Sequence, residues 1–249
     1  MIRVCVAGIT GWTGRPIAEA VEAAADLELV AGVSRSADGE RIFASVAEAL
    51  DAASADVLVD YTSATAVKGN VLAALERRVA VVVGSSGLGA ADYEEIDARA
   101  REARVGVVAA GNFSVLAALL LRSAAEIARH VPAWEIVDYA SDTKQDAPSG
   151  TSRELAERLA TVREPAPQQT LHGVLEARGA GIGGTHVHSV RLPSFVVSTE
   201  IVFAAPDERL VLRHDAGASP QPYVQGTLLA VREVPKRVGL TRGLDSLLP

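Results

Sequence analysis

The stretch VCVAGITGWTGRPIAEAV, residues 4–21, decides the fold. An apolar, strand-like run leads into a turn with Gly8, Gly11 and Gly14, and an alanine-rich helical pattern follows. Glycine allows a tight turn, a close backbone approach to a pyrophosphate, and close packing of helix on strand. The amides at the start of the helix favour phosphate. An ordinary glycine-rich turn is the alternative to the dinucleotide site that we predict. At the predicted dinucleotide site, the residues expected to contact the cofactor are Gly8, Thr10, Gly11, Trp12, Thr13 and Gly14.

Strand-like and helix-like segments alternate through the first half of the chain. Valine-rich runs occur at 2–7, 27–33, 56–61, 79–83 and 105–109. Alanine-rich helical patterns lie between them at 15–25, 45–53, 65–77 and 90–103. Continuous apolar strands that alternate with helices are typical of a parallel sheet covered on both faces. We therefore predict an α/β, Rossmann-like parallel-sheet domain.

The pattern changes after about residue 112. Helices are expected at 114–130, 151–162 and 222–233, and strands at 134–140, 185–193, 195–204 and 208–214, with a Pro/Gln-rich link at 163–169. Consecutive strands without helices between them favour antiparallel pairing. The sequence thus predicts a smaller α/β domain with a mostly antiparallel sheet.

Composition narrows the class of protein. The net charge is −7, so we expect neither nucleic acid nor an anionic membrane as a partner. The single cysteine cannot form a disulfide framework or a cysteine zinc site, which fits a reducing cytoplasm. We see no secretion leader and no apolar run of about 18 residues, the length of a membrane span. We therefore expect a cytoplasmic protein whose anionic ligands are met by local cations rather than by the overall charge.

The end of the second predicted strand indicates which nucleotide binds. An NAD site usually has an acidic residue there for the ribose 2′-hydroxyl. This chain has Ser34, Arg35 and Ser36 instead. A neutral hydroxyl removes repulsion against a 2′-phosphate, and Arg35 offers it a planar donor fork. We predict a preference for NADPH, with NADH possible as a second cofactor. The alternative is that Arg35 is only a solvated loop charge.

Four further motifs stand out: VDYTSATAV at 59–67, VVVGSSGL at 81–88, VVAAGNFSVLAALL at 107–120 and KQDAPSGT at 144–151. Together with the glycine-rich turn, they resemble the 4-hydroxy-tetrahydrodipicolinate reductase (dihydrodipicolinate reductase) family, the nicotinamide enzymes of the diaminopimelate–lysine pathway. The resemblance extends from residue 2 to VGLTRGLDSLL at 238–248, and DAPSGT is its most specific part. It implies a dinucleotide-binding domain of residues 1–112 and 220–249. It also implies a substrate-binding and oligomerisation domain of residues 113–219, and a homotetramer.

The resemblance also implies roles for individual residues. Beside the nicotinamide it places Thr62, Gly84, Ser85, Ser86, Asn112 and Phe113. It makes Lys144 the lysine that binds a substrate carboxylate and serves catalysis, with Ser141, Ser149, Gly150 and Thr151 as further substrate contacts. Each has a simpler alternative: a serine can cap a turn, and a single lysine is often only a surface charge.

The expected proton donor is missing. The family pattern E-x-H-H-x-x-K, aligned on Lys144, places Ala140 and Ser141 where the family has its two histidines. Alanine carries no proton to donate, and the serine hydroxyl is far too weak an acid near neutral pH. Downstream, RLPSFVVSTE at 191–200 replaces an acidic, glycine-bearing family segment. Ser198 and Thr199 stand where that segment has Glu-His. A changed substrate or proton route would explain both departures.

Two functions remain open at this point. The first is an NADPH-dependent reductase that transfers hydride to a cyclic carboxylated imine or enamine, either 4-hydroxy-tetrahydrodipicolinate or a related compound. The second is a catalytically impaired, nucleotide-binding regulatory homologue. His186 and His188 have a spacing that metal sites use, but no third ligand is evident in the sequence, so we expect no metal.

Overall fold

The computed structural model describes residues 1–36, 39–166, 172–193 and 195–249. The chain divides into two compact units. Unit 1 consists of Met1–Val115 and Pro220–Pro249, and unit 2 consists of Leu116–Ser219. The sequence placed the first boundary slightly earlier, after residue 112.

Unit 1 is built on a seven-stranded sheet with the order β12-β6-β5-β4-β1-β2-β3, in which every neighbouring pair is parallel. Its strands are β1 (Ile2–Ala7), β2 (Leu27–Val33), β3 (Ile42–Phe43), β4 (Val57–Asp60), β5 (Ala80–Val83), β6 (Gly106–Ala109) and β12 (Gly239–Arg242). All residues of β4, β5 and β6 are buried, which explains their continuous apolar sequences. The predicted Rossmann-like parallel sheet is confirmed.

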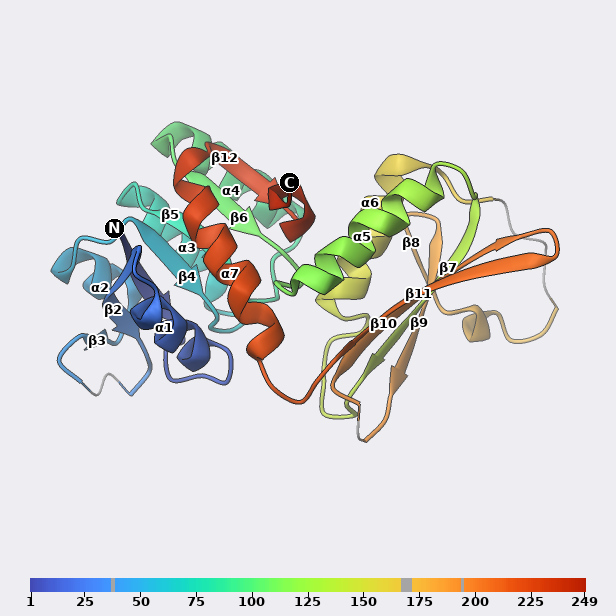
Figure 1. Ribbon diagram of the computed structural model, residues 1–249, viewed down its shortest axis with the longest axis horizontal. Coiled ribbons are helices and arrows are strands. Elements are labelled where there is room, and N and C mark those ends of the chain that lie inside the picture. Colours follow the sequence, from blue (N-terminus) through green and yellow to red (C-terminus); the bar gives the residue numbers. More distant parts are fainter. Residues whose placement is uncertain (37–38, 167–171, 194) are drawn as a thin grey trace. The chain divides into compact units, whose positions relative to one another are not determined.

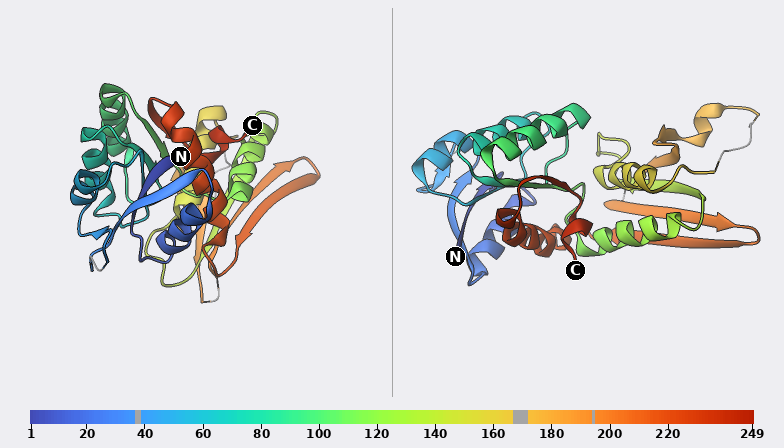
Figure 2. Two further views of the ribbon diagram at one scale, coloured as in Figure 1. Left: turned by 60° about the vertical axis from the view of Figure 1, so that its left-hand side comes forward. Right: turned by 90° about the horizontal axis from the view of Figure 1, so that it is seen from above.

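Helices cover both faces of this sheet (Figures 1 and 2). One face carries α2 (Val46–Ala52), α3 (Val67–Glu76) and α4 (Ala90–Ala103), whose apolar side chains share one core with the strands. The opposite face carries α1 (Gly14–Ala23) and α7 (Gln221–Glu233), which pack on each other. The chain reverses direction across the sheet between β1 and β4, where open parallel sheets place their ligands at the carboxyl ends of the strands.

Unit 2 has a five-stranded sheet with the order β11-β10-β7-β9-β8. Its strands are β7 (Ala133–Ala140), β8 (Ala180–Ile182), β9 (Thr185–Arg191), β10 (Val197–Ala205) and β11 (Glu208–Ala216). Among the described strand pairs of this second sheet, only β7–β9 is parallel. The predicted, mostly antiparallel second sheet is therefore confirmed.

One face of this sheet is covered and the other is open. Helices α5 (Val115–Ala128) and α6 (Gly150–Val162) share an apolar core with the covered face. Burial alternates strictly along β7, so Trp134, Ile136, Asp138 and Ala140 are buried while their neighbours are partly exposed. This alternation decides which side chains of β7 can meet the loop before α6.

The sequence-based elements agree with the structure in kind, with differences at their ends. Three short strands, β3, β8 and β12, and the 3-10 helices Leu175–Arg178, Val234–Lys236 and Leu244–Leu247 were not predicted. The predicted link at 163–169 is irregular over residues 163–166, and residues 167–169 lie outside the described part. Over the described ranges, no helix is both long and apolar enough to cross a membrane.

Candidate active site

The glycine-rich turn after β1 leaves no space for side chains at two of its glycines. Gly8 has a φ of +82°, and a Cβ atom there would collide with the carbonyl oxygen of Tyr61. A Cβ atom on Gly14, the first residue of α1, would collide with the carbonyl oxygen of Gly8. The Gly11 amide donates to the same oxygen at 2.8 Å and closes the turn. The turn thus brings the amides at the start of α1 to the carboxyl end of β1, the arrangement that a pyrophosphate needs.

Hydroxyl groups meet at the end of β2. The Ser34 hydroxyl lies 2.9 Å from the Thr10 hydroxyl and 3.1 Å from the Ser36 hydroxyl. Ser34 is buried, whereas Arg35 is exposed beside it. The structure thus brings together Thr10 of the glycine-rich turn with the predicted residues of the β2 loop. Hydroxyls and a guanidinium occupy the place where an NAD site usually has a carboxylate.

Trp12 lies in the same turn with an exposed side chain. Its indole is 56% exposed and contacts the edge of the Tyr223 ring, with 6.2 Å between ring centroids. Thr13 precedes α1 as its N-cap residue, but its side chain makes no capping hydrogen bond. Backbone amides therefore remain the main phosphate donors that this turn offers.

Asp60 links two of the predicted nicotinamide-side residues. Its completely buried carboxylate ends β4 and accepts hydrogen bonds from the Thr62 amide at 3.1 Å and the Thr62 hydroxyl at 2.8 Å. It also accepts from the Ser85 hydroxyl at 2.6 Å and from Asn70 Nδ2 at 2.8 Å. Sequence reasoning missed Asp60 and Asn70. An acidic residue closing the apolar run VLVD was the available signal.

The other predicted nicotinamide-side residues differ in how exposed their side chains are. Ser86 is exposed in the loop after Gly84. Asn112 Oδ1 accepts a hydrogen bond from the Ser114 amide at 2.8 Å, which shapes the turn before α5. Phe113 is only 2% exposed, and its ring packs edge-on against Tyr61 at 6.1 Å. The Phe113 ring is therefore part of the core, and the Phe113 carbonyl lies against Gly226.

The loop after β7 carries the predicted substrate lysine. The Lys144 ammonium lies 2.7 Å from Asp146 Oδ1, and the Lys144 amide donates to the carbonyl of Ser141. The Ser141 hydroxyl lies 2.9 Å from the Thr143 hydroxyl and 3.2 Å from Asp142 Oδ1. Lys144 is therefore held by a carboxylate of its own loop.

The DAPSGT turn ends at the start of α6. Ser149 is the N-cap residue, and its hydroxyl accepts from the Ser152 amide. The helix begins at Gly150, one residue before the start predicted from the sequence. Gly150 is partly exposed, whereas Ser149 and Thr151 are buried. An anion at this helix start would meet mainly backbone amides and the positive end of the helix dipole.

A buried carboxylate beneath the turn was not anticipated from the sequence. Asp138 is completely buried, and Asp138 Oδ2 accepts from the Ser149 amide at 2.9 Å, from Arg191 Nη2 at 2.7 Å and from the Ser189 hydroxyl at 3.2 Å. Asp138 Oδ1 accepts from the Ser149 hydroxyl at 2.5 Å and from the Ser152 hydroxyl at 3.0 Å. We call Asp138, Ser149, Ser152, Ser189 and Arg191 the Asp138 network.

The structure shows which face of β7 is occupied by Ala140 and which by its neighbour Tyr139. Ala140 is completely buried on the same face of β7 as Asp138. Tyr139 points to the other face, where it stacks on Phe195 at 5.4 Å and lies under the guanidinium of Arg213. Asp138 pairs across the sheet with Thr199, which also accepts or donates a hydrogen bond with Ser152 at 3.0 Å. The two segments that the sequence analysis expects to depart from the family pattern are thus neighbours in the sheet.

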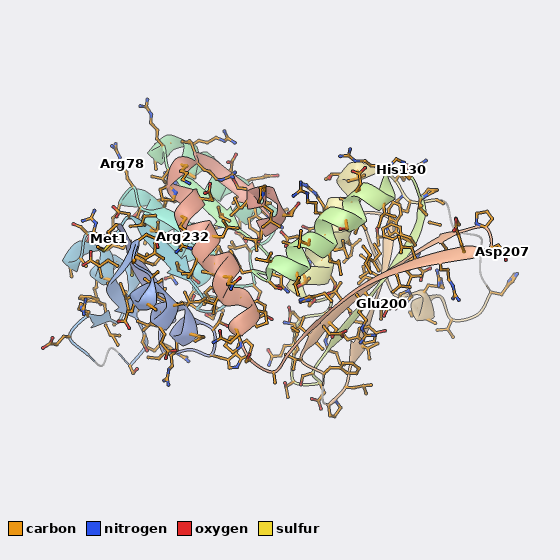
Figure 3. All side chains as sticks on the ribbon, in the orientation of Figure 1. Met1, Arg78, His130, Glu200, Asp207 and Arg232 are labelled. Atoms are coloured by element: carbon orange, nitrogen blue, oxygen red, sulfur yellow. The ribbon has the colours of Figure 1, made fainter. Side chains whose placement is uncertain are left out.

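Three of the five histidines lie beside structural partners. His186 Nδ1 lies 2.7 Å from the carbonyl of Arg178, and His188 Nε2 lies 2.7 Å from Glu135 Oε2. His130, labelled in Figure 3, lies near the end of α5, 3.6 Å from Glu126. In the part of the chain that the structure describes, no three His, Cys, Asp or Glu side chains are grouped to hold a metal ion.

Comparison with known proteins identifies the family. Residues 2–113 match the family description "Dihydrodipicolinate reductase, N-terminus", and residues 114–248 match "Dihydrodipicolinate reductase, C-terminus". The chain belongs to the dihydrodipicolinate reductase family. The resemblance inferred from the sequence is confirmed, and the protein is a reductase that depends on a nicotinamide nucleotide.

Relatives of this dihydrodipicolinate reductase family member match over the whole chain. The 4-hydroxy-tetrahydrodipicolinate reductase of Cutibacterium acnes is 38% identical over 100% of this chain and 99% of its own length. That of Nocardia farcinica is 38% identical over 99% and 98%. Among solved structures, the dipicolinate-bound dihydrodipicolinate reductase from Paenisporosarcina sp. TG-14 is 27% identical, covers 100% of both chains and has a TM-score of 0.80.

Proposed function

We propose that this protein uses NADPH to reduce 4-hydroxy-tetrahydrodipicolinate, the substrate named for its relatives, in the diaminopimelate–lysine pathway. The observation that carries the proposal is the pairing of Lys144 with a DAPSGT turn at the start of α6, in a chain with a dinucleotide turn after β1. Unit 1 supplies nucleotide binding, and unit 2 supplies substrate binding.

The main contacts of the nucleotide with unit 1 are to the backbone of the glycine-rich turn. Gly8 and Gly14 leave room for backbone only, so the amides after Gly8 face the pyrophosphate. The hydroxyls of Thr10, Ser34 and Ser36 surround the ribose, and Arg35 receives the 2′-phosphate of NADPH. NADH has no such phosphate and is the weaker cofactor.

The nicotinamide side depends on loops that a buried carboxylate keeps in place. Asp60 fixes the Thr62 and Ser85 side chains, so both loops keep one conformation beside the ring. A bound reduced nicotinamide supplies the hydride, so the protein needs to orient the substrate rather than activate it.

The substrate is held by its carboxylates in unit 2. Lys144 gives up part of its ion pair with Asp146 to a substrate carboxylate, and the Gly150 and Thr151 amides at the start of α6 hold the other. Ser141 directly follows Ala140, the last residue of β7, and offers its hydroxyl to the same substrate. Since Ala140 carries no acid and Tyr139 points to the other face, water delivers the proton that follows the hydride.

The proposal also concerns where the protein works and in what form. We place it in the cytoplasm, where the biosynthetic pathway runs and where its buried single thiol stays reduced. We propose a homo-oligomer, a tetramer by resemblance to the family, formed through the open face of the unit 2 sheet.

A steady-state assay with NADPH and 4-hydroxy-tetrahydrodipicolinate tests the function. The wild type should oxidise NADPH, and Lys144→Ala should raise KM about 10-fold or more because a charge-assisted carboxylate contact is lost. Lys236→Ala removes an exposed lysine that is paired with Glu233, and it should behave as the wild type. NADPH binding without turnover would favour the regulatory alternative. Unchanged KM and kcat in Lys144→Ala would refute the role of the loop.

A further inference from the structure

We infer that Asp138 is a positioning residue, which fixes the DAPSGT turn from both ends so that its amides and Lys144 meet a substrate dicarboxylate. The inference rests on the proposed function, because the turn matters only if it receives a carboxylate. It assigns a task to a completely buried acidic side chain that the reaction itself does not use.

The far end of the turn is fixed through Ser149. Both the amide and the hydroxyl of Ser149 donate to Asp138, one to each carboxylate oxygen. Two donors from one residue to two oxygens leave Ser149 little freedom to rotate or shift. Ser149 is also the N-cap residue of α6, so its position sets where the Gly150 and Thr151 amides point.

The near end of the turn is fixed through Arg191. One nitrogen of its guanidinium, Nη2, donates both to Asp138 Oδ2 and to the carbonyl oxygen of Asp146, each at 2.7 Å. The side chain of Asp146 in turn holds the Lys144 ammonium. A planar donor fork held by a buried carboxylate therefore locates the segment that carries the lysine.

Asp138 must be ionised to accept so many hydrogen bonds. Burial acts to raise the pKa of Asp138, but the hydrogen bonds from Ser149 and Arg191 outweigh it, and the pKa lies below its usual value. All five donors point at the carboxylate, so an amide in its place would turn its own N–H groups toward other donors.

The same strand provides a matched control. Glu135 is also an acidic residue of β7 paired with an arginine, Arg178, and it accepts from His188. Glu135 belongs to the open face of the sheet, and its partners Arg178 and His188 lie outside the turn. Glu135→Gln therefore makes the same chemical change on the same strand without touching the DAPSGT segment.

The experiment compares Asp138→Asn with Glu135→Gln in the full-length protein. We would measure kcat, KM for 4-hydroxy-tetrahydrodipicolinate, and the Kd values of NADPH and of dipicolinate, a planar dicarboxylate probe. Asp138→Asn should raise KM and the dipicolinate Kd by about 10-fold or more, because misplaced binding groups are costly, and change kcat much less. The NADPH Kd should stay within about twofold of wild type in both variants. Glu135→Gln should leave all four quantities unchanged.

Each other outcome counts against the inference. If folded Asp138→Asn kept the wild-type KM and dipicolinate Kd, the turn would not need Asp138. If Glu135→Gln lost as much binding as Asp138→Asn, the effect would be a general loosening of unit 2. A wild type that neither turned over substrate nor bound dipicolinate would refute the proposed function itself.

Arg191→Lys covers the case in which Asp138→Asn does not fold. Lysine keeps a positive charge against Asp138, but it is a single flexible point charge. It loses the second guanidinium nitrogen, Nη1, whose hydrogen bonds to the carbonyls of Asp138 and Val190 keep Nη2 beside the Asp146 carbonyl. We expect KM and the dipicolinate Kd to rise roughly 3- to 10-fold, with an unchanged NADPH Kd. A folded Arg191→Lys variant with wild-type values for both would overturn the inference.

Discussion

At the scale of single residues, the two departures from the family pattern that the sequence predicts lie next to each other in the structure. Ala140 pairs with Val197, and Asp138 pairs with Thr199, so positions about 60 residues apart in the sequence are neighbours across β7 and β10. The alanine is completely buried, so a histidine there would require its neighbours to move. The replacement of a histidine at this position, which the sequence resemblance implies, would therefore change packing as well as chemistry.

Arg35 gives a residue-scale prediction about the nucleotide. Arg35→Asp should weaken NADPH more than NADH, because it removes a charge-assisted hydrogen bond worth about 1.5–3 kcal/mol and adds repulsion. The ratio of the two Kd values should change by about 10-fold or more. Isothermal titration calorimetry with both nucleotides measures it. Arg41→Asp, at another exposed arginine, is the control, and an equal loss for both nucleotides would show that Arg35 does not contact the 2′-phosphate.

Residue types revealed more of unit 1 than of unit 2. The glycine-rich turn and the serines after β2 were predicted as a group, and the structure brings Thr10, Ser34 and Ser36 together. The carboxylates Asp60 and Asp138 were missed. Asp138 has partners up to 53 residues away, and no local spacing reveals contacts that form only when strands pair.

At the scale of helices and strands, apolar periodicity identified every long element. Buried parallel strands such as β5 are continuous valine runs, whereas buried and partly exposed residues alternate along β7. Both patterns are typical of strands. The three missed strands are two to four residues long. Strand β12, GLTR, contains a glycine and polar residues, and it is a strand because β6 offers it a parallel edge.

Strand β11 gives an element-scale prediction about pH. Burial lowers the pKa of His214 from its usual value of 6.5, and the nearby Asp215 offsets this only in part. As the pH falls, His214 therefore becomes protonated in the unfolded chain at a higher pH than in the folded protein. The free energy of unfolding should decrease as the pH falls below about 6.5, by at most about 1.4 kcal/mol per pH unit.

Urea unfolding at pH 7.5 and 5.5 measures this effect. The fluorescence of Trp134, buried in unit 2, reports the transition. His214→Gln should reduce the difference between the two pH values. His172→Gln, at an exposed histidine, should preserve it. An unchanged pH dependence in His214→Gln would exclude His214 as its source.

At the scale of the whole molecule, the open face of the unit 2 sheet is the surface to test for self-association. Val202 of β10 pairs directly with Val211 of β11 there, and Val137 of β7 pairs with Glu200, two residues from Val202. Val137 and Val202 are partly exposed, and Val211 is exposed. Val211→Arg should shift the protein toward smaller species in size-exclusion chromatography with light scattering, because a charge would enter an apolar interface. Val238→Arg, at an exposed valine of unit 1, should not. If the wild type is a monomer, the proposed oligomer is wrong.

The division of the chain into units has a consequence for synthesis on the ribosome. Unit 2 is one continuous insertion, whereas unit 1 needs Pro220–Pro249 to complete its sheet with β12 and to cover one face with α7. Translation therefore delivers every strand of unit 2 before the last strand of unit 1. Until then the nascent chain carries an open β6 edge and an uncovered apolar surface, the features that chaperones recognise. Unit 1 therefore contains the first residues to be synthesised, but it is the last of the two units to be completed.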